Sequence, residues 1–162
     1  MSGYQVSAVA GREVDAVWPK IDAMVTRGLE AIHDDTTTSA LLREGVRHGR
    51  LVLWIVHSGD EIVAAIVLNI VKRFGGPVLL VVMIAGRDFE AWAPQVQQLL
   101  QDYRQLIGAT RIESVSRPGM EKWMRRLGWR RRAVMMEWKE PPSTEASAEG
   151  VTGAVQRGED HG

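Results

Sequence analysis

The sequence predicts a mixed α/β domain whose elements follow one another in the order β-α-α-β-β-β-α-β-α-β. Three observations lead to this prediction. The spacing of apolar residues alternates between the helical and the strand period along the chain. Each change of period is marked by Gly, Pro or Asp, which favour turns. One strand that is apolar at every position is followed by a helical pattern and then by a further strand, as in an α/β crossover.

Length and composition agree with one domain. The 162 residues are 45% hydrophobic and 25% charged, as in an ordinary globular protein. The absence of Cys excludes disulfides and thiolate chemistry. The 20 basic and 20 acidic residues give a formal net charge of zero, which argues against a field that would attract nucleic acid or an anionic membrane. No apolar run reaches the ~18 residues of a membrane span and no signal peptide is visible, so we expect a cytosolic protein.

The first elements are a weak strand over residues 4–9 and, after Gly11, a long amphipathic helix. The apolar stripe of this helix consists of Val14, Val17, Trp18, Ile21, Met24, Val25 and Ile32. We expect Pro19 to bend or delay the helix. Residues 34–39 offer several N-caps for a short second helix, which Gly49 closes.

Three strands follow the second helix. The first two cover residues 51–57 and 61–71, and the Ser-Gly-Asp segment at 58–60 predicts a hairpin between them. The Phe-Gly-Gly-Pro segment at 74–77 turns the chain again. Residues 78–84 are apolar at every position, which is typical of a central strand covered on both faces.

The most regular helical pattern of the sequence follows Gly86. Its apolar positions are Phe89, Trp92, Ala93, Val96, Leu99, Leu100, Tyr103, Leu106 and Ile107. Pro94 is tolerated only in a first turn, so we expect the helix to start near residues 91–93 and to end at Gly108.

Three shorter elements complete the predicted domain. Residues 110–116 are expected to form a strand, and Pro118 opens a short helix that Gly128 caps. The side chains of this helix that we expect to point inward are Met120, Trp123, Met124 and Leu127. Residues 129–138 are predicted as the last strand.

Charge divides the end of the chain into two parts. Residues 111–139 hold nine basic and three acidic side chains, whereas residues 140–162 hold one and five. The second part has no aromatic residue and buries too little apolar surface to offset the entropy of ordering. We therefore expect a domain over residues 1–139 and a disordered acidic tail over residues 140–162. The basic stretch of Arg125, Arg126, Arg130, Arg131 and Arg132 is predicted to be a solvated edge, with a protein or nucleic-acid contact as the alternative.

Two features of the sequence resemble the GNAT superfamily of N-acetyltransferases. The first is the order of elements, in which an apolar hairpin and an apolar strand ending at Gly86 precede a long helix, a late strand and a short helix. The second is a pair of late motifs, Arg-Pro-Gly-Met-Glu-Lys-Trp at 117–123 and Leu-Gly-Trp at 127–129, which are similar to GNAT-like proteins of tailed bacteriophages. The resemblance covers residues 4–138 and implies a GNAT-like mixed, twisted sheet of about six strands with helices on both faces.

The resemblance also implies an acetyl-CoA site at the end of the apolar strand. Members of the superfamily hold the pantetheine arm along this strand and the pyrophosphate at the following loop and helix N-terminus. Free N–H groups and the helix dipole favour an anion there. The residues that this correspondence places at the cofactor are Met83 and Ile84 at the pantetheine, and Gly86, Arg87 and Asp88 at the pyrophosphate.

The loop departs from the superfamily pattern at two positions. In the superfamily this loop has Arg or Gln, then two residues, Gly, one residue, and Gly or Ala. If Arg87 is the first residue of this pattern, the two small residues are replaced here by Glu90 and Trp92. We expect Glu90 to repel the phosphates and Trp92 to fill their space. Binding of acetyl-CoA is therefore expected to be weak or lost.

Catalytic residues cannot be assigned from the sequence. Acetyl transfer needs a base for the incoming amine, and enzymes of the superfamily often use a Glu near the central strands and a Tyr near the late helix. Residues 78–84 contain no carboxylate, and the late helix contains no Tyr. The remaining candidates are Glu61, Glu113 and Glu121 as bases, which fit solvated charges better, and Tyr4 and Tyr103 as acids. Tyr103 fits a core aromatic better.

No metal site is predicted. The four His residues, His33, His48, His57 and His161, lack the spacing of metal ligands. The sequence also lacks a phosphate-binding P-loop and a nucleophile elbow, which sets hydrolase functions aside.

Two functions from different classes follow from the resemblance. The first is a GNAT-fold phage protein with a degenerate acetyl-CoA site, used as a non-catalytic component of the virion or its assembly. The alternative is an active acetyl-CoA-dependent N-acetyltransferase of unknown acceptor. The expected partners are phage structural proteins or further copies of the chain, without a membrane and without nucleic acid, in the host cytoplasm or the virion.

Overall fold

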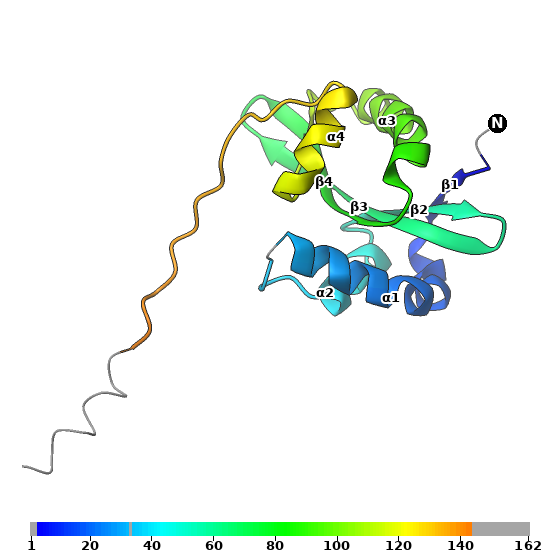
Figure 1. Ribbon diagram of the computed structural model, residues 1–162, viewed down its shortest axis with the longest axis horizontal. Helices are drawn as coiled ribbons and strands as arrows, with labels where there is room; N and C mark the ends of the chain where they lie inside the picture. The colour runs from blue at the N-terminus through cyan, green and yellow to red at the C-terminus, as the bar shows by residue number, and fades with distance from the viewer. Residues whose placement is uncertain (1–2, 33, 144–162) are drawn as a thin grey trace, which may run out of the picture. The chain divides into compact units, whose positions relative to one another are not determined.

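The computed structural model describes residues 3–32 and 34–143, which form one sheet and its covering helices (Figure 1). The strands are β1 (Gln5–Val9), β2 (Val52–Ser58), β3 (Glu61–Arg73), β4 (Gly76–Gly86) and β5 (Ile112–Ser114). The helices are α1 (Val14–Ala31), α2 (Ser39–Arg47), α3 (Phe89–Leu106) and α4 (Glu121–Arg126), and the 3-10 turns η1 (Gly11–Glu13) and η2 (Pro118–Met120) precede α1 and α4. The compact unit ends at Arg131, and residues 132–143 contain no helix or strand.

The sheet has the order β1-β2-β3-β4-β5. The first four strands are antiparallel neighbours, and β5 lies parallel to β4 after the crossover through α3. The predicted hairpin joins β2 to β3, and Gly59 takes a φ of 58° in its turn. Long local strands therefore build most of the sheet, and only β5 comes from the late part of the chain.

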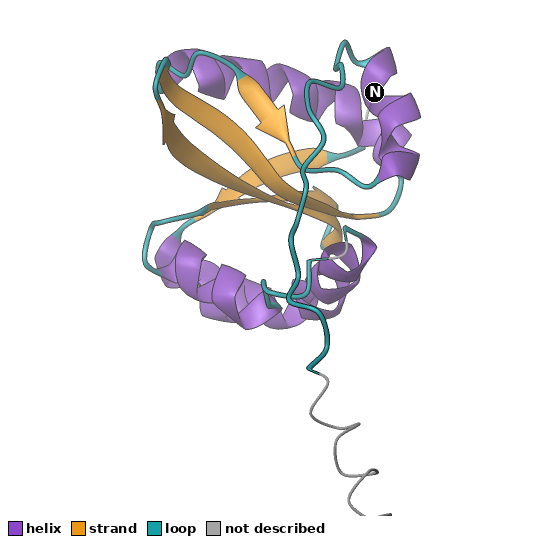
Figure 2. Cartoon of the chain, turned by 90° about the vertical axis from the view of Figure 1, so that its left-hand side faces the viewer, coloured by secondary structure: helices purple, strands orange, loops and turns teal. Residues whose placement is uncertain are grey.

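Helices cover both faces of the sheet, as predicted (Figure 2). One core cluster joins α1 and α2 to one face and includes Trp18, Ile21, Val46, Val67 and Met83. The other joins α3 to the opposite face and includes Ile66, Leu79, Val81, Trp92 and Val96. The apolar strand β4 contributes to both clusters, which confirms the prediction that it is covered on both sides.

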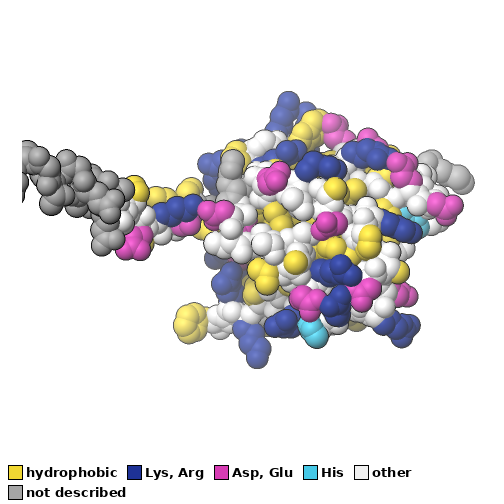
Figure 3. All heavy atoms as spheres, turned by 90° about the horizontal axis from the view of Figure 1, so that it is seen from below, with side chains coloured by type: hydrophobic (Ala, Val, Ile, Leu, Met, Phe, Trp, Pro, Cys, Tyr) yellow, Lys and Arg dark blue, Asp and Glu magenta, His cyan; other side chains and the backbone are white. Residues whose placement is uncertain are grey.

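The outer surface of α1 and α2 carries charges of both signs (Figure 3). Arg43 pairs with Asp15 at 2.7 Å, and Arg47 pairs with both Asp15 and Glu44. The two pairs with Asp15 tie α2 to α1, but because all three pairs are exposed each contributes little to stability. No helix in the described residues is long and apolar enough to span a membrane. Within the same residues, no group of His, Asp and Glu is arranged to hold a metal.

The predicted last strand over residues 129–138 does not form. The described residues therefore contain five strands rather than about six. The large apolar side chains of this segment are between 70% and 86% exposed, and they are Val134, Met135, Met136 and Trp138. A strand needs a neighbour for its N–H and C=O groups, and this segment has none in the described part of the chain. Residues 144–162 of the predicted acidic tail, and His33, lie outside the described residues.

Two predictions about the late helices are wrong. α3 begins at Phe89, before the expected residues 91–93, and so contains Pro94 in its interior. Pro94 cannot donate to the carbonyl of Glu90, and both residues are exposed, so this carbonyl is accessible to water. In the short helix Met124 is buried and Leu127 packs against the α3 core, as expected, whereas Trp123 is only half-buried beneath the Arg126 guanidinium, 4.5 Å from the ring centre.

Candidate cofactor site at the end of β4

β4 and β5 separate halfway along β4. The two strands pair over Leu79–Val81 and Ile112–Ser114. The N–H of Val115 then donates to the carbonyl of Val81 at 3.3 Å, which is the last contact of the ladder. The edge of β4 from Val82 to Gly86 therefore faces no strand in the described residues.

A β-bulge at Val82 sets the orientation of this open segment. Val81 lies opposite Leu68 and Met83 lies opposite Val67, so Val82 is the extra residue. The bulge moves the following side chains to the other face: Val81 packs under α3, whereas Met83 packs under α1. No change of period reveals the bulge, since every residue around it is apolar.

Backbone alternation identifies the groups that face the opening. The N–H of Arg87 donates to the carbonyl of Val63 in β3 at 3.0 Å. Since successive peptide groups of a strand point to opposite edges, those of Ile84 and Gly86 point away from β3, towards the gap. The predicted residue Ile84 thus lies at the gap, whereas the side chain of Met83 is buried in the α1 core.

Gly86 is explained by packing against β3. Its φ is 138°, a conformation that only glycine adopts readily. A Cβ at this position would lie 2.5 Å from the Cα of Ala64 and still closer to the carbonyl oxygen of Val63. The glycine is required here by the close approach of two strands, whether or not a ligand binds.

The loop after Gly86 is held by a network of charged groups. The Arg87 Nη2 lies 2.6 Å from Glu61 Oε1 and its Nε lies 3.6 Å from Asp88 Oδ2. The Tyr4 hydroxyl donates to Asp88 Oδ2 at 3.1 Å. The hydrogen bond to Glu61 raises the pKa of Arg87, and desolvation followed by the bond to Asp88 raises the pKa of Tyr4. Tyr4, one of the two candidate acids, therefore lies beside this loop.

The first turn of α3 completes the site. Asp88 is its N-cap residue and has a left-handed conformation, with φ 59° and ψ 33°. The Trp92 indole N–H donates to the carbonyl of Arg87 at 2.7 Å, and its side chain is 1% exposed within the α3 core. The expectation that Trp92 fills the phosphate space is therefore wrong. Glu90 is exposed on the first turn of α3, and its repulsion of the phosphates stays a prediction.

The other catalytic candidates lie elsewhere or are already paired. Glu113 in β5 pairs with Arg111 at 2.6 Å and with Arg73 at 3.3 Å, and the bond from Arg111 is the main cause of its lowered pKa. Tyr103 packs on Trp54, with 5.6 Å between ring centres, as expected of a core aromatic. Neither residue offers a free acid or base to the gap.

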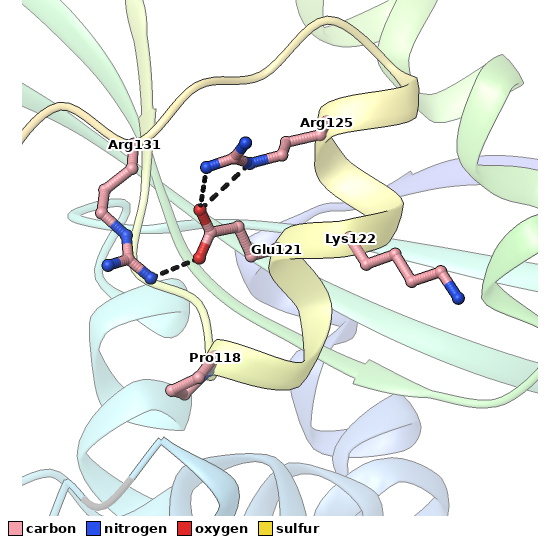
Figure 4. A pocket seen from close by; sticks show the side chains of 5 residues that line it. All are labelled: Pro118, Glu121, Lys122, Arg125 and Arg131. Carbon is pink, nitrogen blue, oxygen red and sulfur yellow. Dashed lines mark hydrogen bonds and ion pairs between the residues drawn. The ribbon is translucent and has the colours of Figure 1, made fainter.

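The basic stretch borders a separate, open hollow of about 550 Å³ (Figure 4). Its lining residues are Pro118, Glu121, Lys122, Arg125 and Arg131. Glu121 accepts from Arg125 at 2.7 Å and pairs with Arg131, and these bonds, Arg125 first, lower its pKa. Glu121 therefore serves as the anchor of two arginines rather than as a base.

Comparisons with known proteins identify the fold. No family model matches the chain, and curated proteins give no match. An aminoglycoside N-acetyltransferase, AAC(6')-Iy, in complex with CoA is 13% identical over 85% of this chain and 94% of its own, with a TM-score of 0.62. An acetyltransferase of Clostridium acetobutylicum with acetyl-CoA is 9% identical over 84% and 96%, with a TM-score of 0.63. A GCN5-related N-acetyltransferase of Ralstonia eutropha is 14% identical over 85% and 97%, with a TM-score of 0.59.

The chain thus has the fold of the GNAT N-acetyltransferases. At identities of 9% to 14%, this likeness establishes the fold alone.

Proposed function

We propose that this chain is a GNAT-fold protein with a weakened acetyl-CoA site that acts as a non-catalytic component of a larger assembly. The observation that carries the proposal is the charge of the loop after β4. Its single cation, Arg87, is paired with Glu61 and Asp88, and Glu90 adds a third carboxylate on the first turn of α3. The more specific role, in a bacteriophage virion or its assembly, rests on the similarity of the motifs at 117–123 and 127–129.

The magnitudes favour repulsion of the cofactor's phosphates. Two like charges 4 Å apart repel by about 1 kcal/mol in water and about 4 kcal/mol near a protein surface. The dipole at a helix N-terminus stabilises a bound anion by about 0.3–1 kcal/mol. The repulsion of the phosphates by three carboxylates, with only one arginine that is already paired, is therefore larger than the attraction by the helix dipole of α3. The open edge of β4 still suits the uncharged pantetheine arm.

The pairing of two candidate bases with arginines supports a non-catalytic role. Two of the carboxylates that the sequence offers as bases are engaged by arginines: Glu61 by Arg87, and Glu113 by Arg111 and Arg73. A base must accept a proton from the acceptor amine. A carboxylate held by a guanidinium is a poor acceptor, because the ion pair stabilises its charged form.

Calorimetric titration with acetyl-CoA tests the proposal. We expect a Kd above ~100 μM, which corresponds to less than ~6 kcal/mol of binding free energy. The double variant Glu61→Gln and Glu90→Gln removes two carboxylates and leaves Arg87 paired with Asp88 alone, so it should bind at least about tenfold more tightly. Glu44→Gln, on the distant helix α2, is the control and should change nothing. Micromolar binding by the unchanged chain would contradict the proposal.

The alternative is an active acetyl-CoA-dependent N-acetyltransferase. It is favoured by the gap between β4 and β5, where the peptide groups of Ile84 and Gly86 are available to a pantetheine arm. Solved structures of this fold hold CoA or acetyl-CoA. Transfer of labelled acetyl groups to a panel of amines, including an aminoglycoside, decides between the two functions. Turnover would support the enzyme, and no transfer together with weak binding would support the non-catalytic protein.

A further inference from the structure

We propose that the tip of the β3–β4 hairpin, residues 72–75, inserts the side chain of Phe74 into an apolar groove between α3 and β1 of a second copy of this chain. Both surfaces lie within the compact unit that ends at Arg131. Neither surface includes the loop after β4, so this association does not depend on acetyl-CoA binding or on the proposed function.

The tip carries an apolar side chain that its own domain does not bury. Phe74 is the most exposed large hydrophobic side chain in the described residues. The ladder between β3 and β4 continues to the pair Arg73–Gly76, so Phe74 and Gly75 are the two loop residues. Turns of this length favour Asn, Asp and Gly. A fully exposed phenyl ring contributes no packing to its own domain, but an aromatic ring is well suited to anchor an interface.

The hairpin extends past the strand beside it. Pairing between β2 and β3 ends at Val52 and Leu68, so residues 69–73 of β3 are bonded to β4 alone. The ladder with β4 holds this finger extended before any partner binds. A preorganised tip loses little conformational entropy on insertion, which favours binding.

The groove has a volume of about 490 Å³ and lies between the later turns of α3 and the first two strands. Its apolar lining residues are Val6, Ala8, Trp54, Leu99, Tyr103 and Leu106. Hollows of ~300–1,000 Å³ hold small molecules, so one aromatic side chain and its neighbours fit this groove.

Two features of the lining favour an aromatic occupant. The rings of Trp54 and Tyr103, with centres 5.6 Å apart, provide aromatic surface for an incoming ring. Leu106 is 82% exposed and is, after Phe74, the most exposed large hydrophobic side chain described in the compact unit. The two most exposed apolar side chains of the unit therefore belong to the tip and to the groove.

The charges of the two surfaces are complementary. Asp102 also lines the groove, and it accepts a hydrogen bond at 2.9 Å from the Gln98 amide, which is neutral and leaves the negative charge of the carboxylate in place. The tip carries Lys72 and Arg73, both exposed, and Arg73 pairs with Glu113 at 3.3 Å. Insertion of the tip brings the Lys72 cation towards the Asp102 carboxylate, and such complementarity steers and orients association.

A second copy is the occupant because the tip cannot reach the groove of its own chain. Trp54 in the groove lies opposite Ile66 of β3. Phe74 is eight residues further along the chain, which corresponds to about 26 Å at the rise of a strand. Tip and groove are different surfaces, so the contact between copies closes in a symmetric oligomer or continues as a filament.

Sedimentation velocity of two variants and of their mixture tests the insertion. Phe74→Ser removes the ring, and Leu106→Lys places a cation at the groove, where it repels Lys72. Both side chains are exposed, so the melting temperatures should not change. The natural chain should associate at concentrations on the order of 100 μM, as expected of a small interface, and each variant alone should be monomeric. An equimolar mixture should form a heterodimer, because Phe74→Ser keeps its groove and Leu106→Lys keeps its tip.

The control is Leu41→Lys on α2, where Leu41 is 59% exposed and belongs to neither surface. This variant should associate like the natural chain. A natural chain that stays monomeric, a mixture that forms no heterodimer, or loss of association in Leu41→Lys would overturn the proposal.

Reversal of the two charges tests the orientation of the tip. Lys72→Asp and Asp102→Lys should each weaken the association by about fivefold, and the double variant should restore it, because opposite charges face each other again. Added salt should weaken the association of the natural chain. A double variant that associates no better than the single variants would contradict the placement of Lys72 beside Asp102.

Discussion

The two edges of β4 differ in how far they are paired. Towards β3 the register extends from Gly76 to Gly86, with one bulge at Val82. Towards β5 it covers only Leu79–Val81. The closed edge lies between two hydrophobic clusters, whereas the open edge ends at a loop rich in charge. Stability therefore resides mainly on the β3 side, and the features that bear on ligand binding lie where the β5 ladder stops.

The largest expected effect distinguishes a buried tryptophan, Trp92 on α3, from a half-buried one, Trp123 on α4. Trp92, at 1% exposure between α3 and the sheet, should cost about 3–5 kcal/mol of unfolding free energy when replaced by Ala. Trp123, half-buried on α4 under Arg126, should cost about 1–2 kcal/mol, since less surface is lost and a cation–π contact contributes about 0.5–1 kcal/mol. Denaturant unfolding of both variants measures the difference. Equal costs would mean that α4 is as well buried as α3.

The next effect concerns the end of the closed edge. Gly86→Ala should destabilise the chain by about 2–4 kcal/mol, because its φ of 138° is strained for Ala and the new Cβ meets the β3 backbone. Gly75→Ala is the matched control, since a Cβ there meets no atom within 4 Å, and it should stay within about 0.5 kcal/mol of the natural chain. Thermal unfolding measures both variants. Equal melting temperatures of Gly86→Ala and Gly75→Ala would contradict the close packing of β3 and β4.

Acid should weaken the domain through carboxylates whose pKa is lowered in the folded state. The hydroxyl of Thr37, followed by further bonds from Thr36 and Thr37, lowers the pKa of Asp34 to about 2. Since the unfolded value is about 3.9, this contribution is complete above pH ~4 and is lost as the pH falls towards ~2. Screening by solvent limits it to on the order of 1 kcal/mol.

Asp34→Asn should flatten the loss of stability between pH 5 and 2, as measured by denaturant titration at each pH. Glu44→Gln provides a comparison on the neighbouring helix. An unchanged acid profile for Asp34→Asn would show that the loop before α2 does not depend on this carboxylate.

The smallest effect is expected from the end of the chain. Removal of residues 140–162, which the composition predicts to be a disordered acidic tail, should leave the melting temperature nearly unchanged. A decrease of about 5 °C or more, on the order of 1 kcal/mol for a domain of this size, would show that the segment packs.

Local periodicity was enough to predict most of the fold. The hairpin of β2 and β3, the buried strand β4 and the helices α1 and α3 have patterns that depend on their own residues. The apolar stripe of α3 also predicted that Trp92 is buried, and the structure shows this burial. The other expectation, that Trp92 fills the space of the phosphates, is wrong. The GNAT resemblance assigned Met83 and Ile84 to the pantetheine arm; the structure buries Met83 in the α1 core, and the assignment of Ile84 stays a prediction.

The remaining features depend on contacts that the sequence does not display. The bulge at Val82 lies in a run of apolar residues, so no change of period reveals it. Tyr4 reaches Asp88 across 84 positions of the chain, a contact that only the sheet order creates. Residues 129–138 have the pattern of a strand, but a pattern cannot supply the partner strand.

A ligand without phosphates tests the weakened loop most directly. Calorimetric titrations with S-acetyl-pantetheine and with acetyl-CoA, at low and at moderate salt, compare the pantetheine arm alone with the whole cofactor. Repulsion from Glu61, Asp88 and Glu90 predicts that acetyl-CoA binds no more tightly than the fragment, and that added salt strengthens its binding by screening the repulsion. If acetyl-CoA binds tenfold or more tightly than the fragment and loses affinity with salt, the loop grips the phosphates and the site is intact.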